Sequence, residues 1–202
     1  MLRVYLAGPD VFLPDPIGMG GRKKAICAAH GLEGAFPLDA ELALSGSAPA
    51  KAGFRIYKAN KALMESCDLA IANMTPFRGP SMDVGTAFEM GFMRALGRPV
   101  LGYTNVADGF FERTKAFLGP REVVARGKAF FDPSGMSIEN FDMVDNLMLE
   151  SAVIESGVTI VRKAVPAKER FTNLDAFAEC VKLAAQRFGD SSDAARLSRA
   201  GA

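Results

Sequence analysis

Two carboxylates stand six residues apart in SMDVGTAFEMG, residues 81–91, among side chains that are mostly small or apolar. Asp83 directly precedes a helical pattern, so its carboxylate can cap the first free amides. Glu89 is expected on the flank of that helix, less than two turns from its start, where the helix dipole favours an ionised acid. Gly85, one turn earlier, has no side chain to cover it. An ionised carboxylate in a partly dry cleft suits nucleophilic attack on an electrophilic sugar carbon.

A structural interpretation of the two acids is also open from this stretch alone. Asp83 would then only cap the helix, and Glu89 would point into water or pair with Arg78 or Arg94. Acids in structural ion pairs are common in proteins, so composition and spacing do not decide between the two interpretations.

The elements that must position these residues alternate between strand and helix patterns. Short apolar runs predict strands at 2–8, 32–38, 68–74, 99–103 and 157–161. Helices are expected around 21–30 and at 54–67, 84–96, 143–153 and 174–188. The third helix has an apolar stripe expected to face the sheet, consisting of Val84, Phe88, Phe92 and Ala95. Without internal repeats, this alternation predicts an α/β fold, a doubly wound (flavodoxin-like) five-stranded parallel sheet with flanking helices.

The organisation of the chain is expected to be simple. Its 202 residues are enough for one well-packed domain, which we place at 1–188. Residues 45–53, SGSAPAKAG, are predicted to form a flexible loop. Residues 105–140 are long for a connection and predict an insertion, while the small, polar tail at 189–202 is expected to be disordered.

Composition excludes several functional classes. The formal net charge is +1 with Lys and Arg scattered, which gives no basic surface for nucleic acid. Three distant cysteines lack the spacing of a disulfide framework or a zinc site. The first residues are interrupted by Gly8-Pro9 too soon for a signal peptide, and no apolar run approaches the roughly 20 residues of a membrane helix. We therefore expect a soluble cytoplasmic protein with no nucleic-acid or membrane partner.

The loops that follow the predicted strands point to one crevice. In open α/β sheets, ligands sit beyond the carboxyl ends of the strands. The loops GPDVF, TPFRGPSMD and TNVADGFF leave these ends. The residues expected to face the crevice are Asp10, Phe12, Phe77, Arg78 and Asp83.

Four segments carry a resemblance to a known family. VYLAGPDVF, CDLAIANMTPFRG, DVGTAFEMGFMRALGRPVLGY and DNLM occur in this order, and together they resemble the nucleoside 2-deoxyribosyltransferases. The resemblance covers roughly residues 3–104 in pieces and resumes at 145–149, and its most specific part is the D-x-G-x-x-x-E-x-G core. It favours the chemical interpretation of Glu89.

The resemblance implies a role for each matching position. Glu89 matches the nucleophile that attacks C1′ of a 2′-deoxynucleoside, and a second base then captures the covalent deoxyribosyl-enzyme with net retention. Tyr5 matches a tyrosine whose hydroxyl holds that glutamate. Asp83 matches an acid that grips the sugar hydroxyls, and Asp68 one close to the sugar and base. Asn146 matches an asparagine that reaches the active site of a neighbouring subunit, which implies a homo-oligomer.

The remaining expectations concern binding and proton transfer. Asp68 and Asp10 are candidates for the general acid, and Phe12 and Phe77 are candidates either to stack on the base or simply to fill the core. No metal or redox cofactor is required, and the partners implied are deoxynucleosides and free nucleobases. The substrate-binding residues expected are Gly8, Asp10, Phe12, Phe77, Arg78, Gly85 and Asn146.

Three alternatives stay open. A hydrolase on the same fold cuts deoxynucleoside 5′-monophosphates with water, but those relatives carry a phosphate-binding serine at the position of Asp83, where an acid would repel a dianion. A phospho-receiver needs an acceptor aspartate at the end of the third strand, which here is ANM. The third alternative is a non-catalytic nucleoside-binding protein.

Overall fold

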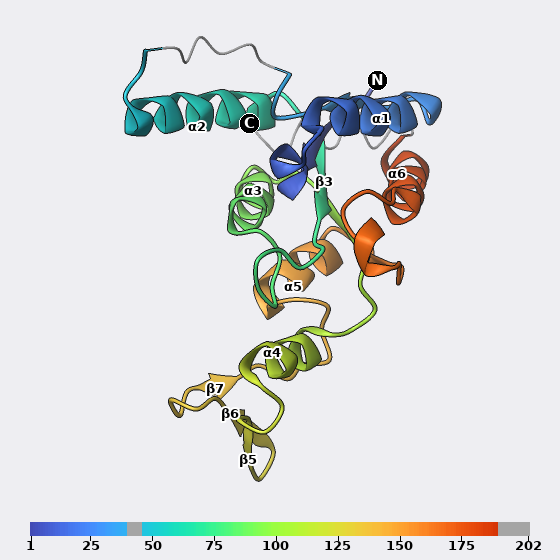
Figure 1. Cartoon of the computed structure of the whole chain (residues 1–202). Helices are drawn as coiled ribbons and strands as arrows, with labels where there is room; N and C mark the ends of the chain where they lie inside the picture. Colours follow the sequence, from blue (N-terminus) through green and yellow to red (C-terminus); the bar gives the residue numbers. More distant parts are fainter. Residues whose placement is uncertain (40–45, 190–202) are drawn as a thin grey trace.

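The computed structural model describes residues 1–39 and 46–189, and its centre is a five-stranded sheet (Figure 1). The strands lie in the order β2-β1-β3-β4-β8, and every neighbouring pair is parallel. This is the flavodoxin-like order, so the predicted fold class is confirmed. The strand bounds are β1 (Arg3–Ala7), β2 (Glu33–Ala35), β3 (Leu69–Asn73), β4 (Val100–Thr104) and β8 (Val161–Arg162).

Helices cover both faces of the sheet because successive strand residues point to opposite sides. From β1, Val4 and Leu6 enter a core shared with α1 and α6, whereas Tyr5 and Ala7 enter a core shared with the other helices. α1 (Pro16–Ala29) and α6 (Asp175–Phe188) cover the first face. The second face is covered by α2 (Pro49–Glu65), α3 (Val84–Ala95) and α5 (Leu147–Glu155).

The stretch expected as an insertion holds its own small structure, which extends away from the main sheet (Figure 1). It begins with α4 (Phe110–Leu118). An antiparallel three-stranded sheet follows, made of β5 (Val124–Arg126), β6 (Ala129–Phe131) and β7 (Ser137–Ile138). Two short 3-10 helices complete the chain, η1 (Pro9–Phe12) after β1 and η2 (Ala167–Glu169) after β8. Across the described ranges, no helix is long and apolar enough to cross a membrane.

Several boundaries differ from the sequence-based expectation. The loop expected at 45–53 is helical from Pro49 onward, since proline is well suited to the first turn of a helix. α1 likewise begins at Pro16, where the side chain of Asp15 accepts a hydrogen bond from the amide of Gly18 at 2.9 Å. Residue 45 and, apart from Gly189, the tail expected to be disordered lie outside the described residues.

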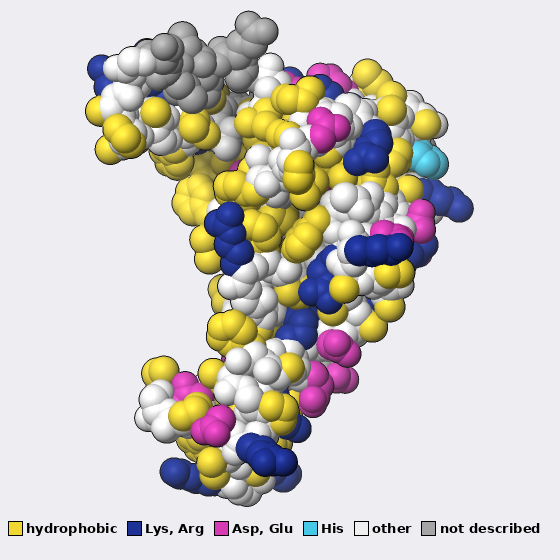
Figure 2. Space-filling model, in the orientation of Figure 1, with side chains coloured by type: hydrophobic (Ala, Val, Ile, Leu, Met, Phe, Trp, Pro, Cys, Tyr) yellow, Lys and Arg dark blue, Asp and Glu magenta, His cyan; other side chains and the backbone are white. Residues whose placement is uncertain are grey.

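The predicted orientation of α3 is wrong. Val84 and Phe88 are 84% and 53% exposed, and the helix buries Thr86, Met90 and Met93 instead. Three exposed aromatic rings and the partly buried ring of Phe92 pack on one another across two helices, in the row Phe54, Tyr57, Phe88 and Phe92. We call these four residues the α2–α3 aromatic surface. Hydrophobic side chains gather over this part of the molecule in Figure 2.

Candidate active site

Tyr5 and Glu89 meet at the interface of β1 and α3. The ring of Tyr5 is fully buried on the α3 side of the sheet, and its hydroxyl donates a hydrogen bond to Oε1 of Glu89 at 2.5 Å. Glu89 reaches this position from the flank of α3, between the buried face and the exposed aromatic face. The strand and the helix therefore fix the glutamate from two directions.

Burial dominates the ionisation of Glu89. It raises the pKa of the carboxyl to about 7, with the hydrogen bond from Tyr5 lowering the pKa and the charge of Asp83 raising it further. The sequence predicted that the helix dipole would favour the ionised form, but the pKa of Glu89 is raised, with burial as the largest cause. At neutral pH, both the acid and the carboxylate are present. Burial and Glu89 together raise the pKa of Tyr5 far above its ordinary value, so its hydroxyl stays protonated and remains a donor.

Asp83 caps the amino end of α3, as its position before the helix predicts. Its Oδ2 accepts hydrogen bonds from the amide of Thr86 at 2.9 Å and from the hydroxyl of Thr86 at 3.0 Å. Within the described residues, its Oδ1 accepts none. The helix cap therefore uses one oxygen of this carboxylate and leaves the other without a hydrogen bond from the described residues.

A cavity of about 350 Å³ brings the two acids together with residues from the loops after β1 and β2. Its volume is near the lower end of the range of roughly 300–1,000 Å³ that is usual for small-molecule sites. It lies beyond the carboxyl ends of the strands, where α/β sheets bind their ligands. Of the expected site residues, it is lined by Gly8, Phe12, Asp83, Gly85 and Glu89. A larger hollow of about 550 Å³ between α5 and α6 has no carboxylate in its lining.

Comparison with known proteins identifies the family to which this chain belongs. The sequence model of the nucleoside 2-deoxyribosyltransferase family matches residues 4–148, which is most of the chain and includes every residue of the cavity. The chain belongs to this family.

Individual proteins are similar to this chain over most of its length. An uncharacterised protein of Schizosaccharomyces pombe is 32% identical over 164 residues, which are 76% of this chain and 78% of the relative. A solved 2-desoxiribosyltransferase from Leishmania mexicana superposes with a TM-score of 0.59 at 26% identity, covering 89% of this chain and 98% of its own. A conserved protein from Enterococcus faecalis shares the fold with a TM-score of 0.50 at 18% identity, covering 90% of this chain and 98% of its own.

An aromatic shelf lies beside the cavity of this deoxyribosyltransferase-family protein. Phe12 lines the cavity and is 56% exposed, and its ring stacks on Phe77 with centroids 5.5 Å apart. The guanidinium of Arg78 lies over both rings, 4.6 Å from the Phe77 centroid and 5.1 Å from that of Phe12. Phe77 and Arg78 therefore support Phe12 from outside the cavity lining, and no ion pair within the described residues joins Arg78 to Asp83 or Glu89.

Asp10 is engaged in a buried ion pair. Its carboxylate lies 2.7 Å from Nζ of Lys23, and the two side chains are 2% and 1% exposed. The ammonium also lies 5.0 Å from the ring centroid of Phe177. Asp10 does not line the cavity. The pair anchors η1 to α1. This short helix directly follows Gly8 and ends at Phe12, and both of these residues line the cavity.

Two positions to which the resemblance assigned roles do not line this cavity. Asp68 stands at the amino end of β3, where it accepts a hydrogen bond from the amide of Arg3 at 2.7 Å. Asn146 caps α5 by accepting from the amide of Met148 at 3.1 Å, and its side-chain amide donates to Glu139 at 2.7 Å. Neither side chain lines the cavity in this single chain.

The structure adds lining residues that the sequence did not single out. Leu38 follows β2, Ile56 and Asn60 come from α2, and Thr86 belongs to the first turn of α3. Asn60 stands out as an amide among the mostly apolar walls. No local pattern indicates these residues, because α2 reaches the cavity through tertiary packing.

Proposed function

We propose that this protein transfers 2-deoxyribose between nucleobases through a covalent deoxyribosyl–Glu89 intermediate. The observation that carries the proposal is the Glu89 carboxylate at the cavity wall, held by the Tyr5 hydroxyl at 2.5 Å. In the first step, a carboxylate oxygen attacks C1′ and the bond to the base breaks, with the departing base taking up a proton from water. In the second step, an incoming base attacks C1′, the bond to Glu89 breaks and the new base loses its proton to water, so two inversions give net retention.

The neighbouring residues support this chemistry. Tyr5 orients the carboxylate, and its hydrogen bond favours the ionised, nucleophilic form. The Oδ1 atom of Asp83 accepts a hydrogen bond from a sugar hydroxyl while Oδ2 keeps the helix cap. Phe12 offers an exposed ring on which the base stacks. Asp10 and Asp68 do not line the cavity, so neither is proposed as the general acid that protonates the departing base.

We also propose that the active species is a homo-oligomer. Three rings of the α2–α3 aromatic surface, Phe54, Tyr57 and Phe88, are exposed in the single chain, although exposed apolar groups of this kind often mark a contact with another protein. This surface adjoins the cavity, since Ile56 and Gly85 line the cavity from the same two helices. A second copy that covers it would also lie near the catalytic glutamate, in keeping with a role for Asn146 in the site of a neighbouring subunit.

A base-exchange assay tests the proposed function. Thymidine or deoxyinosine is incubated with adenine, and chromatography follows the appearance of deoxyadenosine. We expect exchange from 2′-deoxynucleosides and little from the matching ribonucleosides. Glu89→Gln protein purified in parallel is the control for contaminating activity. Release of free deoxyribose without any exchanged nucleoside, across several acceptor bases, would instead identify a hydrolase.

A further inference from the structure

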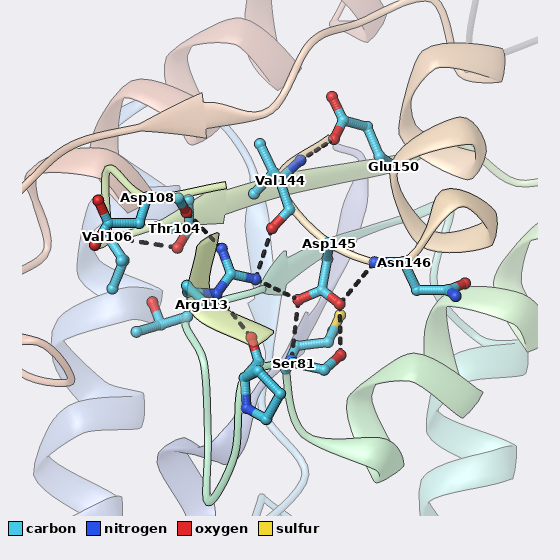
Figure 3. A network of polar contacts seen from close by, with 12 residues as sticks. Ser81, Thr104, Val106, Asp108, Arg113, Val144, Asp145, Asn146 and Glu150 are labelled. Atoms are coloured by element: carbon cyan, nitrogen blue, oxygen red, sulfur yellow. Dashed lines mark hydrogen bonds and ion pairs between the residues drawn. The ribbon is translucent and has the colours of Figure 1, made fainter. Parts of the chain in front are cut away.

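Asp145 lies at the centre of a buried polar network next to the proposed site (Figure 3). Its side chain has no exposed surface. It accepts hydrogen bonds from the hydroxyl of Ser81 at 2.5 Å, the amide of Met82 at 3.0 Å and the amide of Asn146 at 2.8 Å. Arg113 completes the set at 3.2 Å. A buried carboxylate with this many donors is well satisfied and rigidly held.

Arg113 extends the network into the insertion, because it belongs to α4. Its Nε donates to the carbonyl of Pro80 at 2.7 Å, and its two terminal nitrogens donate to the carbonyls of Asp108 at 2.6 Å and Val144 at 2.7 Å. The guanidinium therefore ties together three segments: the loop before α3, the start of α4 and the chain before α5. Figure 3 shows these groups converging on the one side chain.

The loop residues held by this network stand directly before the proposed site. Pro80, Ser81 and Met82 lead without a gap into Asp83, which caps the helix that carries Glu89. A shift at Met82 is therefore passed through the backbone to Asp83. Misplacement of catalytic groups by about 1 Å can cost on the order of 100-fold in rate.

We infer that Asp145 and Arg113 are positioning residues, which hold residues 80–82 so that Asp83 and the start of α3 keep their place at the cavity. The inference rests on the proposed function. It also assigns a structural role to the insertion, because Arg113 belongs to α4. A buried ion pair contributes little net stability compared with an apolar replacement, which favours a geometric role for this one.

The test compares conservative variants with a matched control. Asp145→Asn and Arg113→Lys keep size and polarity but weaken the network. Asp132→Asn is the control, because Asp132 also accepts several hydrogen bonds within the insertion, from Ser134 and Met136. We expect kcat/KM for base exchange to fall about 10- to 100-fold in the first two variants while circular dichroism shows them folded at the assay temperature. The control should stay within about twofold of wild type.

A double-mutant cycle separates positioning from a general loss of structure. If Asp145 acts through Asp83, the Asp83→Asn substitution should cost much less in an Asp145→Asn background than in wild type. The inference would be overturned if the fold-losses of kcat/KM in the two single variants simply multiplied in the double variant. A folded Asp145→Asn protein with normal kcat/KM would overturn it as well. Should Asp145→Asn fail to fold, Ser81→Ala removes only one donor, and a folded Ser81→Ala protein is expected to lose about 3- to 10-fold.

Hydrogen–deuterium exchange gives a readout that does not need turnover. Asp145→Asn should speed exchange of the amides of Met82 and Thr86, whereas Asp132→Asn should leave them unchanged. If the wild-type protein shows no base exchange, the proposed function fails, and this measurement still decides whether the network holds the loop. Unchanged protection in Asp145→Asn would refute the positioning role by itself.

Discussion

The hydroxyl of Tyr5 donates its hydrogen bond to Glu89 across 84 positions of sequence, joining β1 to α3 at the wall of the cavity. Asp83 acts on the same glutamate with the opposite effect. The bond from Tyr5 lowers the pKa of Glu89, whereas the negative charge of Asp83 raises it. The two neighbours can therefore be tested separately, because their removal should move the pKa of one carboxyl in opposite directions.

Replacement of Glu89 tests its role as nucleophile. Glu89→Ala and Glu89→Gln should each lower base exchange by at least about 10³-fold, since neither side chain can form the intermediate. Glu65→Gln, which alters an exposed i,i+4 pair with Lys61, should leave exchange unchanged. A 2′-fluorinated deoxynucleoside should leave a sugar on the wild-type protein that intact mass detects and peptide mapping places on Glu89. An adduct on another carboxylate would return Glu89 to a structural role.

The pH profile should follow the ionisation of Glu89. We expect kcat/KM to rise with pH through an apparent pKa of about 7, as the carboxyl becomes ionised in the free protein. Tyr5→Phe removes a hydrogen bond to the carboxylate and should shift this limb to higher pH. Asp83→Asn removes a nearby negative charge and should shift it to lower pH. Shifts in the same direction for both variants would contradict this account of the site.

The same carboxyl should make stability depend on pH. Its pKa is about 7 in the folded protein, against an ordinary value of 4.5. Its favourable contribution to the free energy of unfolding is therefore complete below pH 4.5 and is lost as the pH rises to about 7. Urea denaturation should show that the free energy of unfolding of Glu89→Gln increases relative to that of wild type over this pH range, by about 1–3 kcal/mol at pH 8. If the free energy of unfolding of wild type instead increased relative to that of the variant as the pH rises, this prediction would be wrong.

The buried ion pair beneath η1 should be far more sensitive than a surface pair. Lys23→Met leaves Asp10 charged and unpaired in the interior, which should lower the free energy of unfolding by about 3–5 kcal/mol. Lys61→Met breaks an exposed pair with Glu65 and should cost under about 1 kcal/mol. Urea denaturation at pH 7 measures both. Equal losses in the two variants would show that burial does not govern the energy of the first pair.

Assembly can be tested at the α2–α3 aromatic surface. Phe88→Ser should weaken self-association in sedimentation velocity, because it removes an apolar ring from the proposed contact. Phe117→Ser, at a phenylalanine of α4 that is 67% exposed, is the matched control and should leave association unchanged. Activity per subunit should fall on dilution below the dissociation constant. A fully active wild-type monomer would exclude the homo-oligomer as the required species.

Mixed subunits test the part assigned to Asn146. An Asn146→Ala chain combined with an inactive Glu89→Ala chain should regain some exchange, since hybrid sites then contain one intact copy of each residue. No recovery after the two chains are shown to associate would place Asn146 in the structure of its own subunit, where its side chain caps α5.

The first four strands were predictable because each is a short apolar run between turn signals, but the position of the fifth strand and the orientation of α3 were not. The fifth strand was expected at 157–161 and is Val161–Arg162. The prediction placed the stripe of Val84, Phe88, Phe92 and Ala95 against the sheet, whereas Met90 and Met93 fill that interface. Flexible methionines fit such irregular space well. Phe88 packs on Tyr57 of α2 at the surface, a contact that depends on how two helices meet, and Phe92 stacks on Phe88.

The candidate site likewise contains residues that local sequence predicts and residues that only the fold brings together. The cap at Asp83 follows from local sequence, because a helix start needs an acceptor there. The partner of Glu89 is a residue of β1, and the family resemblance, rather than any spacing rule, indicated Tyr5. The sequence does not indicate the role of Asp145, although it stands beside Asn146 in the same DNLM segment, because only the fold brings its partners Ser81 and Arg113 near it.

The cap on α3 also restricts what the cavity can admit. Both hydrogen bonds from Thr86 fall on Oδ2 of Asp83, which leaves Oδ1 as the atom that can meet a ligand. A carboxylate oxygen accepts hydrogen bonds and donates none. A hydroxyl at that point is therefore matched, whereas a ketone, an ether or a phosphate oxygen would place one electron-rich atom against another. Under the proposed function, the residue that caps the helix would therefore favour ligands that offer a hydroxyl proton to this oxygen.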